Sequence, residues 1–314
     1  MLDSLTGLSV GDALGATFPI MGRSIPELRA GNLPAGPWNW TDDTEMACGV
    51  VAELCENGQI DQDHLAASFA RHMDRDRDYG FFAVDTLRKV RDGMAWDRAS
   101  GSTYDGQGSC GNGGAMRVAP LGAYFAQDPE CIVRQAVRSA EVTHMHPEGV
   151  AGAVAVALGA GLAAHARISG TALTADQFIT MLLARLDDGE TSRGIGRALA
   201  LLGAPVDEAA AELGNGSRVT AQDTVPFTVW VAATHLQDYP GAVATCVEAG
   251  GDMDTTAAIA GGIVSARTGS EGIPAPWLAA REPLPDWANA AIADASARGE
   301  QARSGRLRRW FSGR

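Results

Sequence analysis

Two short segments each place two carboxylates and a threonine hydroxyl directly before a predicted helix. The first is Thr41-Asp42-Asp43-Thr44, and the second is Asp252-Met253-Asp254-Thr255, about 210 residues later. A helix cap needs one oxygen acceptor, so each segment carries more oxygen ligands than capping requires. Hard oxygen ligands of this kind favour Mg²⁺, Mn²⁺ or Ca²⁺ over zinc, and four carboxylates are enough for two such ions.

Helix capping is the simpler interpretation of either segment taken alone. Thr41 or Asp42 has the right position to cap the next helix, and Asp42-x-x-Glu45 has the spacing of a capping box. Four clustered carboxylates without a cation would repel one another, and some would stay protonated. The repetition of the same residue types at two helix starts therefore favours a site for divalent cations.

A glycine-rich segment offers a second kind of chemistry. Four glycines within seven residues permit positive φ angles and close approach of the backbone to a ligand, so their N–H groups can point at a diphosphate. No Gly-Lys-Ser/Thr follows and no strand precedes the segment, which excludes a P-loop and a dinucleotide fingerprint. A flexible surface turn is the alternative. The segment reads Gln107-Gly108-Ser109-Cys110-Gly111-Asn112-Gly113-Gly114-Ala115-Met116-Arg117.

Two further positions carry titratable side chains in unusual surroundings. His144 and His146 are two residues apart and so do not share a helix face, which argues against a metal-binding pair and favours a structural hydrogen bond. Asp12 stands among small and apolar residues in Leu8-Ser9-Val10-Gly11-Asp12-Ala13-Leu14-Gly15. If that carboxylate is buried it needs a partner, and the simpler interpretation is N-capping or a salt bridge.

The elements that position these residues are predicted to be helices. Apolar residues recur with helical spacing along most of the chain, and Gly or Pro marks many of the boundaries. Alternating runs of Val and Ile are rare, so a sheet is not expected. We therefore predict one all-α domain over residues 1–300 and a basic tail over 301–314. The predicted helices are Thr44–Glu56, Asp63–Met73, Phe82–Met94, Pro129–Ala140, a long helix from Pro147, Thr174–Leu186, Ser192–Leu202, Val206–Leu213, Val225–Leu236, Pro240–Ala249, Thr255–Arg267 and Pro285–Ala297.

Composition narrows the functional classes. The chain has 314 residues, 46% hydrophobic and 20% charged, which is typical of a globular protein. Its formal net charge of −13 argues against general binding to nucleic acids. The 38 glycines lack a three-residue period, and we expect many of them to allow close packing of helices.

The cysteines and the apolar runs indicate where in the cell the protein is expected. The five cysteines include no C-x-x-C pair, which suits reduced thiols in a cytoplasmic protein and offers no zinc framework. The longest apolar run, from Gly149 to Ala164, is rich in Ala and Gly, and we interpret it as a buried helix rather than a membrane span. The expectation is a cytoplasmic monomer, with oligomers left open.

In this order, the segments resemble the ADP-ribosylglycohydrolase family, which includes the dinitrogenase reductase-activating glycohydrolase and the serine- and arginine-specific ADP-ribosyl hydrolases. The resemblance spans roughly Leu5 to Thr268. It rests on Gly11-Asp12-Ala13-Leu14-Gly15, Trp40-Thr41-Asp42-Asp43-Thr44, Gly111-Asn112-Gly113-Gly114-Ala115-Met116-Arg117, Thr143-His144 and Gly251-Asp252-Met253-Asp254-Thr255. The resemblance implies a multi-helix orthogonal bundle with two Mg²⁺ or Mn²⁺ ions in a central cleft.

The resemblance also assigns residues to roles. The implied metal ligands are Thr41, Asp42, Asp43, Asp252, Asp254 and Thr255. The implied ADP-ribose site comprises Ser109, Gly111, Asn112, Gly113, Gly114, Met116 and His144, with His144 near the phosphates. The implied catalytic carboxylates are Asp42, Asp43 and Asp85, of which Asp85 matches the family loosely.

The implied reaction is hydrolysis of the glycosidic bond that links ADP-ribose to a modified target, through an oxocarbenium-like state. One position departs from the family: Pro19 stands about where close relatives carry Glu, and Pro neither ligates nor accepts a proton. A catalytically silent ADP-ribose-binding protein therefore remains an alternative, as does a hydrolase of another ribosyl or nucleotide-like molecule. The leaving group, the acid and base, and the choice between Mg²⁺ and Mn²⁺ stay open. Met253, between the two aspartates, replaces the common Thr or Arg, and we expect only a local effect.

Overall fold

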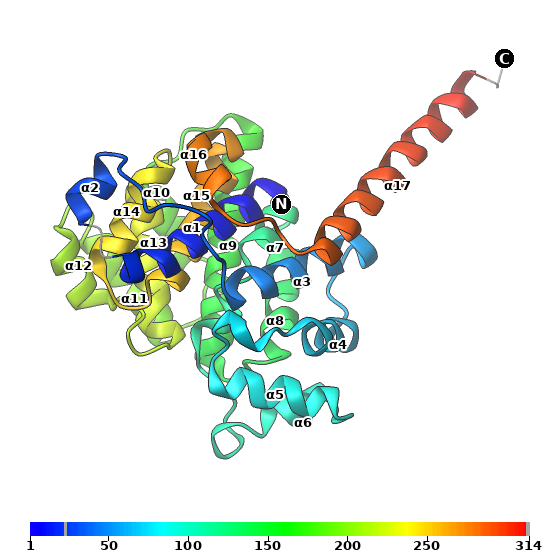
Figure 1. Cartoon of the computed structure of the whole chain (residues 1–314), viewed down its shortest axis with the longest axis horizontal. Coiled ribbons are helices and arrows are strands. Elements are labelled where there is room, and N and C mark those ends of the chain that lie inside the picture. Colours follow the sequence, from blue (N-terminus) through cyan, green and yellow to red (C-terminus); the bar gives the residue numbers. More distant parts are fainter. Residues whose placement is uncertain (22–23, 312–314) are drawn as a thin grey trace.

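The computed structural model describes the backbone of residues 1–21 and 24–311 and the side chains of residues 1–21 and 24–298. Within this part of the chain there are seventeen α-helices, four short 3₁₀ helices and no strand, so the predicted all-α fold is confirmed (Figure 1). The first nine α-helices are α1 (Leu2–Met21), α2 (Ile25–Arg29), α3 (Asp42–Asn57), α4 (Gln62–His72), α5 (Phe81–Arg91), α6 (Trp96–Gly101), α7 (Ala119–Tyr124), α8 (Pro129–Glu141) and α9 (Pro147–Ser169). The others are α10 (Ala175–Leu183), α11 (Glu190–Ala200), α12 (Val206–Leu213), α13 (Ala221–Thr234), α14 (Tyr239–Ala249), α15 (Met253–Thr268), α16 (Ala275–Ala280) and α17 (Asp286–Phe311).

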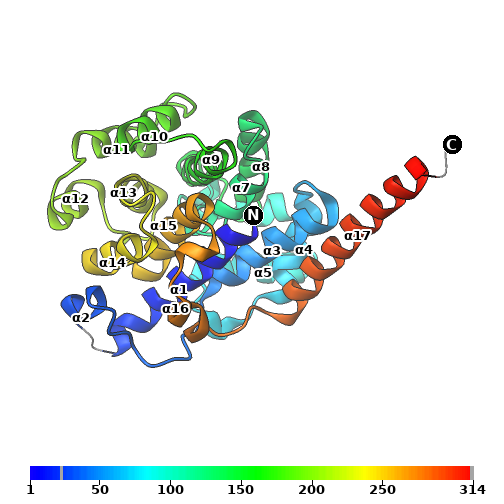
Figure 2. The ribbon, with the colours of Figure 1, turned by 90° about the horizontal axis from the view of Figure 1, so that it is seen from above.

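The first helix, α1, and the late helix α15 run side by side in opposite directions at the centre of the fold (Figure 2). Glycines let their backbones approach: a Cβ on Gly11 would lie 2.2 Å from the Ala257 carbonyl oxygen, and one on Gly15 would lie 2.5 Å from the Met253 oxygen. Any larger side chain at either position would force the helices apart. This antiparallel pairing brings the middle of α1 close to the start of α15.

The apolar helix α9 lies in the core, as its composition predicts. It packs against α7, α8, α13 and α15, and a Cβ on Gly122 of α7 would lie 1.9 Å from the α9 carbonyl oxygen of Ala157. Within the described residues it is the one helix long and apolar enough to cross a membrane. Most of its apolar stretch is buried inside the protein, as expected of a core helix.

The predicted helices recur with small shifts at their ends. Helix α12 has the predicted bounds, whereas α13 begins at Ala221 rather than at Val225 and runs through Pro226. The short helices α2, α6, α7 and α16, of five or six residues each, escaped prediction because they span too few turns to show a period.

The last helix, α17, continues past the predicted end at Ala297 to Phe311, through the boundary predicted at residue 300. Its first turns pack against α3, and Trp287 stacks on the ring of His72 with centroids 4.1 Å apart. Figure 1 shows the rest of α17 extending away from the other helices. Of the predicted basic tail, residues 312–314 lie outside the described part.

Candidate functional site

The two acidic segments meet at the starts of α3 and α15. Asp43 is buried, and its Oδ2 accepts hydrogen bonds from Thr41 Oγ1 at 3.3 Å and from Thr255 Oγ1 at 3.4 Å. Thr255 lies 212 residues from Asp43 in the chain. The structure thus brings the two segments together around one carboxylate.

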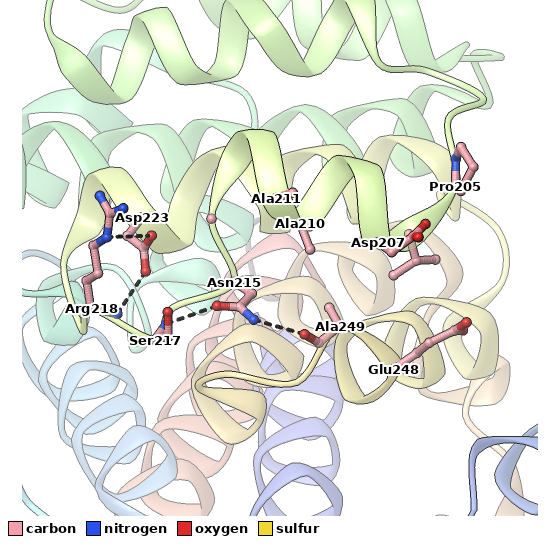
Figure 3. A pocket seen from close by; sticks show the side chains of 12 residues that line it. Pro205, Asp207, Ala210, Ala211, Asn215, Ser217, Arg218, Asp223, Glu248 and Ala249 are labelled. Atoms are coloured by element: carbon pink, nitrogen blue, oxygen red, sulfur yellow. Dashed lines mark hydrogen bonds and ion pairs between the residues drawn. The ribbon is translucent and has the colours of Figure 1, made fainter.

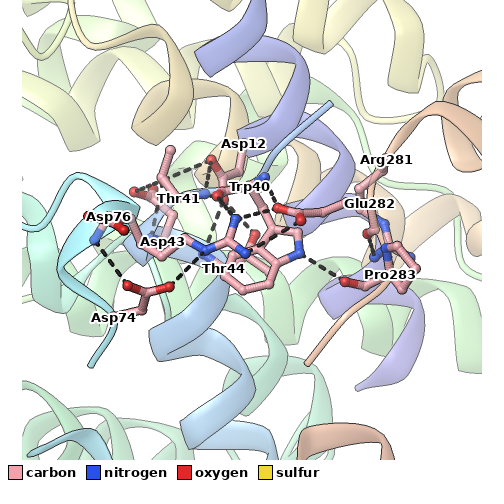
Figure 4. Close-up of polar contacts among 11 residues, drawn as sticks. Asp12, Trp40, Thr41, Asp43, Thr44, Asp74, Asp76, Arg281, Glu282 and Pro283 are labelled. Atoms are coloured by element: carbon pink, nitrogen blue, oxygen red, sulfur yellow. Dashed lines mark hydrogen bonds and ion pairs between the residues drawn. The ribbon is translucent and has the colours of Figure 1, made fainter. Parts of the chain in front are cut away.

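Asp12, in the middle of α1, organises the first segment (Figure 4). Its buried carboxylate accepts the backbone N–H groups of Thr41 at 3.0 Å and Thr44 at 3.1 Å. It also accepts both threonine hydroxyls, at 2.9 and 2.5 Å. Asp12 therefore satisfies free donors at the start of α3, which is the partner that burial of this acid requires.

The predicted capping box at α3 does not form. Thr41 is the N-cap and accepts the Asp43 N–H, whereas Glu45 turns away to accept the Asp74 N–H at 3.0 Å and the Tyr79 hydroxyl at 2.7 Å. Asp42 makes no capping bond either, because it is the first residue of the helix. Capping therefore leaves the carboxylates of Asp42 and Asp43 unexplained.

The chain beyond α16 supports the segment before α3. Glu282 accepts the Trp40 N–H at 2.9 Å, and the Pro283 carbonyl accepts the indole N–H at 3.1 Å (Figure 4). The Arg77 guanidinium lies 3.5 Å from the centroid of the Trp40 ring and pairs with Glu282. These contacts hold the segment before α3 in place.

The glycine-rich segment is tied to the second acidic segment by a side-chain amide. Asn112 Nδ2 donates to Asp252 Oδ2 at 2.7 Å and to Thr224 Oγ1 at 3.1 Å. Asp252 is the N-cap residue of α15, yet its side chain accepts no capping bond from that helix. Side-chain capping, the simpler interpretation of this segment, therefore does not explain Asp252, whose carboxylate is turned toward the glycine-rich segment instead.

The turn at residues 214–220 contacts both the second acidic segment and the glycine-rich segment. It was not predicted from the sequence. Asn215 O accepts the Asp252 N–H at 3.1 Å, and Val219 O accepts the Asn112 N–H at 3.3 Å. Gly216, with φ of 83°, leaves no room for a side chain, since a Cβ there would lie 2.5 Å from Asp252 Cβ. The Gly-Asn-Gly sequence at 214–216 is a turn signal, but nothing in it indicates the contact with Asp252.

The outer face of this turn lines a hollow of about 870 Å³ (Figure 3). Polar groups there pair with one another: Asn215 Nδ2 donates to Ala249 O at 2.9 Å, and the Arg218 N–H donates to Asp223 Oδ2 at 2.9 Å. None of the predicted site residues lines this hollow. The predicted site is therefore not in this hollow.

Most of the predicted site residues line a smaller cavity of about 540 Å³. Its floor is acidic, one wall is the glycine-rich segment, and the rim carries three aromatic rings. Thr41, Asp85 and Gly114 do not line it, and Gly114 packs on Ala140 instead. The predicted residues that do line it are Asp42, Asp43, Ser109, Gly111, Asn112, Gly113, Met116, His144, Asp252, Asp254 and Thr255.

A second cavity of about 670 Å³ lies on the other side of the acidic cluster. Asp78, Asp252 and Asp254 line both cavities, so the carboxylates stand where the two cavities meet. Thr41 and Pro19 line only the second cavity. Pro19 is exposed and lies near the end of α1, so it brings no carboxylate to this cavity.

Asp85 is not brought to the other predicted residues. It lies on α5, where it pairs with Arg88 at 2.9 Å and with Lys89 at 2.8 Å. The Lys89 hydrogen bond is the main reason that the pKa of Asp85 is lowered. A carboxylate held in this way on the surface is poorly placed for proton transfer in the cavity.

The two histidines have separate roles. His146 caps α9, because its Nδ1 accepts the Glu148 N–H at 3.1 Å. His144 lines the cavity and fills the space beside two glycines of the loop: a Cβ on Gly111 would lie 3.1 Å from its Nε2, and one on Gly113 only 2.9 Å. The glycine-rich segment is therefore a packed 3₁₀ turn around His144 rather than a flexible surface turn.

Burial and mutual repulsion raise the pKa values of the carboxylates in the acidic cluster. Burial, and then the charges of Asp12 and Asp254, hold the pKa of Asp42 and of Asp43 well above the usual range. Burial followed by the charge of Asp254 raises the pKa of Asp252 to about 8. A divalent cation would offset this repulsion.

The donor set is compatible with such a cation. Asp43 Oδ1 is buried and has no hydrogen-bond partner, so it is free to ligate. Among the side chains described, no group of three or more His, Cys, Asp or Glu residues is arranged to hold an ion as it stands. Two threonine hydroxyls, from Thr41 and Thr255, complete an all-oxygen set that suits Mg²⁺ or Mn²⁺.

Several residues of the cavity were not predicted from the sequence. Asp78, with φ of 64°, lies between the two cavities, and Phe81, Phe82 and Tyr104 form the aromatic rim. Phe81 is 79% exposed, which is unusual for a large apolar side chain. The adjacent phenylalanines had a plain interpretation as the apolar face of α5, and only their exposure indicates a ligand-facing role.

Comparison with known proteins gives a consistent result. The sequence model of the family described as ADP-ribosylglycohydrolase matches residues 1–305. The ADP-ribosylhydrolase ARH3 of Gallus gallus is 28% identical over 326 residues, covering 87% of this chain and 86% of that protein. The ADP-ribosyl-[dinitrogen reductase] glycohydrolase of Rhodospirillum rubrum is 27% identical over 289 residues, covering 88% of each.

A solved structure supports the same conclusion. The chain of an ADP-ribosylglycohydrolase-related protein complex superposes with a TM-score of 0.58 at 25% identity, covering 93% of this chain and 95% of that one. The family match spans nearly the whole molecule, including both acidic segments and the glycine-rich segment. The protein described here belongs to the ADP-ribosylglycohydrolase family.

Proposed function

We propose that this protein hydrolyses the glycosidic bond between ADP-ribose and a modified target, releasing ADP-ribose. One observation carries the proposal: the acidic cluster around Asp43 stands where two cavities meet. Cleavage of a bond between two parts of a substrate needs space for each part on either side of the reacting atoms. The cavity beside the glycine-rich segment would hold ADP-ribose, and the one beside Pro19 would hold the target.

Two divalent cations, Mg²⁺ or Mn²⁺, complete the proposed site. Thr41, Asp42 and Asp43 would ligate from α3, and Asp252, Asp254 and Thr255 from α15. When bound, such ions supply Lewis acidity and lower the pKa of water. The free Oδ1 of Asp43 and the repulsion among the carboxylates support this assignment.

The chain's own groups have distinct tasks in this proposal. The glycine-rich segment at Gly111 to Gly113 and the imidazole of His144 would line the diphosphate, which an acidic chain cannot bind by net charge. Asp42 or Asp43 would move the proton to or from the leaving atom, because both carboxylates line the cavity.

The position of Pro19 favours a second candidate function, a catalytically silent protein that binds ADP-ribose. Pro19 lies in the target-side cavity at about the position where close relatives carry Glu, so one acid of the expected site is missing. A catalytically silent protein that binds ADP-ribose would need no such acid. A hydrolase of another ribosyl or nucleotide-like small molecule would use the same acidic cluster with a different ligand in the first cavity.

A panel of linkages separates these functions. Arginine-, serine- and nucleic-acid-linked ADP-ribose would be incubated with the protein in Mg²⁺, in Mn²⁺ and in chelator, and free ADP-ribose would be measured. We expect release from at least one linkage, loss of release in Asp254→Asn, and retention in the matched surface variant Asp85→Asn. Binding of ADP-ribose without release from any linkage would support the silent alternative, and absence of binding would support a different small-molecule substrate.

A further inference from the structure

Arg117 is fully buried without a carboxylate partner. Its guanidinium forms no salt bridge with any described residue, and burial lowers its pKa to about 9, so it remains charged at neutral pH. One nitrogen donates to Ser139 O at 2.6 Å and another to Thr143 Oγ1 at 2.9 Å. The Phe69 ring covers the guanidinium, with its centroid 4.7 Å from Cζ. A buried cation of this kind needs a reason, because its desolvation is costly.

The Arg117 contact determines where the hydroxyl proton of Thr143 points. A guanidinium only donates hydrogen bonds, so Thr143 Oγ1 must accept from it. The hydroxyl is buried, with the residue 2% exposed, and its one other hydrogen-bond partner within the described part of the chain is His144 Nδ1 at 2.7 Å. A buried hydroxyl proton without an acceptor is costly, so Thr143 donates to Nδ1.

This donation leaves His144 with a defined proton position. Burial and the charge of Arg117 lower the pKa of His144 to about 3, so the ring is neutral and carries one proton. Since Nδ1 accepts from Thr143, that proton is on Nε2. Nε2 has no hydrogen-bond partner among the described residues, although His144 is only 8% exposed and lines the cavity.

We propose that Arg117 and Thr143 are positioning residues that fix His144 with its Nε2–H directed at the cavity, as a neutral donor for an anionic oxygen of the ligand. The opposite tautomer would present a lone pair and repel such an oxygen. The identity of the ligand as ADP-ribose rests on the proposed function, but the proton position does not. Gly111 and Gly113 reinforce the arrangement, because a Cβ at either position would lie against the imidazole ring.

The proton position is tested first without ligand. The full-length chain labelled with ¹⁵N-histidine would be measured by NMR at pH 7, with the His144 signals assigned from a His144→Gln sample. We expect a protonated Nε2 and an unprotonated Nδ1. A proton on Nδ1, or an imidazolium ring, would overturn the proposal.

Thr143 variants test the relay. Thr143→Val keeps the shape of the side chain but removes the hydroxyl, and Thr143→Ser keeps the hydroxyl. Thr143→Ala also removes the hydroxyl and replaces the valine variant if that one fails to fold. We expect mixed tautomers in the Val and Ala variants and the native pattern in Ser. An unchanged His144 tautomer in the variants lacking the hydroxyl would contradict the role of Thr143, whatever their stability.

Binding provides the functional readout. Calorimetry with ADP-ribose should show affinity about tenfold weaker in Thr143→Val and within about twofold of native in Thr143→Ser, as expected for one hydrogen bond to a charged oxygen. Equal affinity in both variants would overturn the donor role of Nε2. If the native chain itself fails to bind ADP-ribose, the proposed function is wrong, whereas the NMR result still decides the proton position.

Discussion

Asn112 donates its side-chain amide to Asp252 at 2.7 Å, across a sequence separation of 140 residues. The same amide nitrogen also donates to Thr224, on α13. One asparagine therefore fixes the glycine-rich wall of the cavity against the acidic segment at the start of α15. The distance between the diphosphate-binding part of the proposed site and its carboxylates depends on this contact.

Asn112→Ala tests that contact. Removal of a buried donor to a carboxylate should lower the free energy of unfolding by about 1–3 kcal/mol and reduce ADP-ribose release at least about tenfold. Asn57→Ala is the control, because Asn57 is exposed and its side-chain amide donates to a carboxylate, that of Glu53 on α3, away from the cavity. Urea unfolding and turnover would be measured on both, and similar effects in the two variants would argue against a special role for Asn112.

Asp12→Ala should be among the more damaging substitutions in the fold. It removes an acceptor shared by four buried donors of Thr41 and Thr44, so we expect a loss of about 2–4 kcal/mol in urea unfolding. Asp61→Ala, which removes an exposed N-cap on α4, should cost only about 1 kcal/mol. Equal losses would mean that Asp12 acts as an ordinary cap.

The raised pKa values predict how stability depends on pH in the absence of metal. Burial raises the pKa of Asp12 to about 7, and burial raises that of Asp252 to about 8, against about 3.9 in an unfolded chain. A raised folded-state pKa contributes stability that is present below the unfolded value and is lost as the pH rises through the folded value. The melting temperature in chelator should therefore fall between about pH 5 and pH 8.

Divalent cations should reverse this trend. Mg²⁺ or Mn²⁺ replaces protons in offsetting the repulsion, so the added ion should raise the melting temperature more at pH 8 than at pH 5. Asp252→Asn should flatten the pH dependence in chelator and reduce the gain from metal. A metal-induced gain that is the same at both pH values would speak against binding at these carboxylates.

Gly113→Ala should weaken the ADP-ribose site without unfolding the protein. The new Cβ would lie 2.7 Å from His144 Cε1, so the ring or the loop must shift, and we expect affinity at least about tenfold weaker by calorimetry. Gly196→Ala on α11 is the control, because its Cβ meets nothing within 4 Å and should stabilise the helix by up to about 1 kcal/mol. Native affinity in Gly113→Ala would contradict the assignment of this loop to the ligand.

Local patterns in the sequence predicted the helices and the two acidic segments because both are visible within a few residues. The contacts of Asp12 could not be predicted, since they join the middle of one helix to the start of another. Asp85 shows the converse: Arg88 and Lys89 follow it at the three- and four-residue spacings of ion pairs on one helix face, a signal that already favoured a surface role. The turn at residues 214–220 acts entirely through tertiary contacts.

The rate of ADP-ribose release from a modified protein, measured with and without chelator for the native chain and for Asp43→Asn, tests the central claim most directly. Asp43 touches both acidic segments and has a buried oxygen free to ligate. We predict that chelator abolishes release, that Mg²⁺ or Mn²⁺ restores it, and that Asp43→Asn lowers it by about a hundredfold or more. Full activity in chelator, or in Asp43→Asn, would contradict a metal-dependent hydrolase site at this carboxylate cluster.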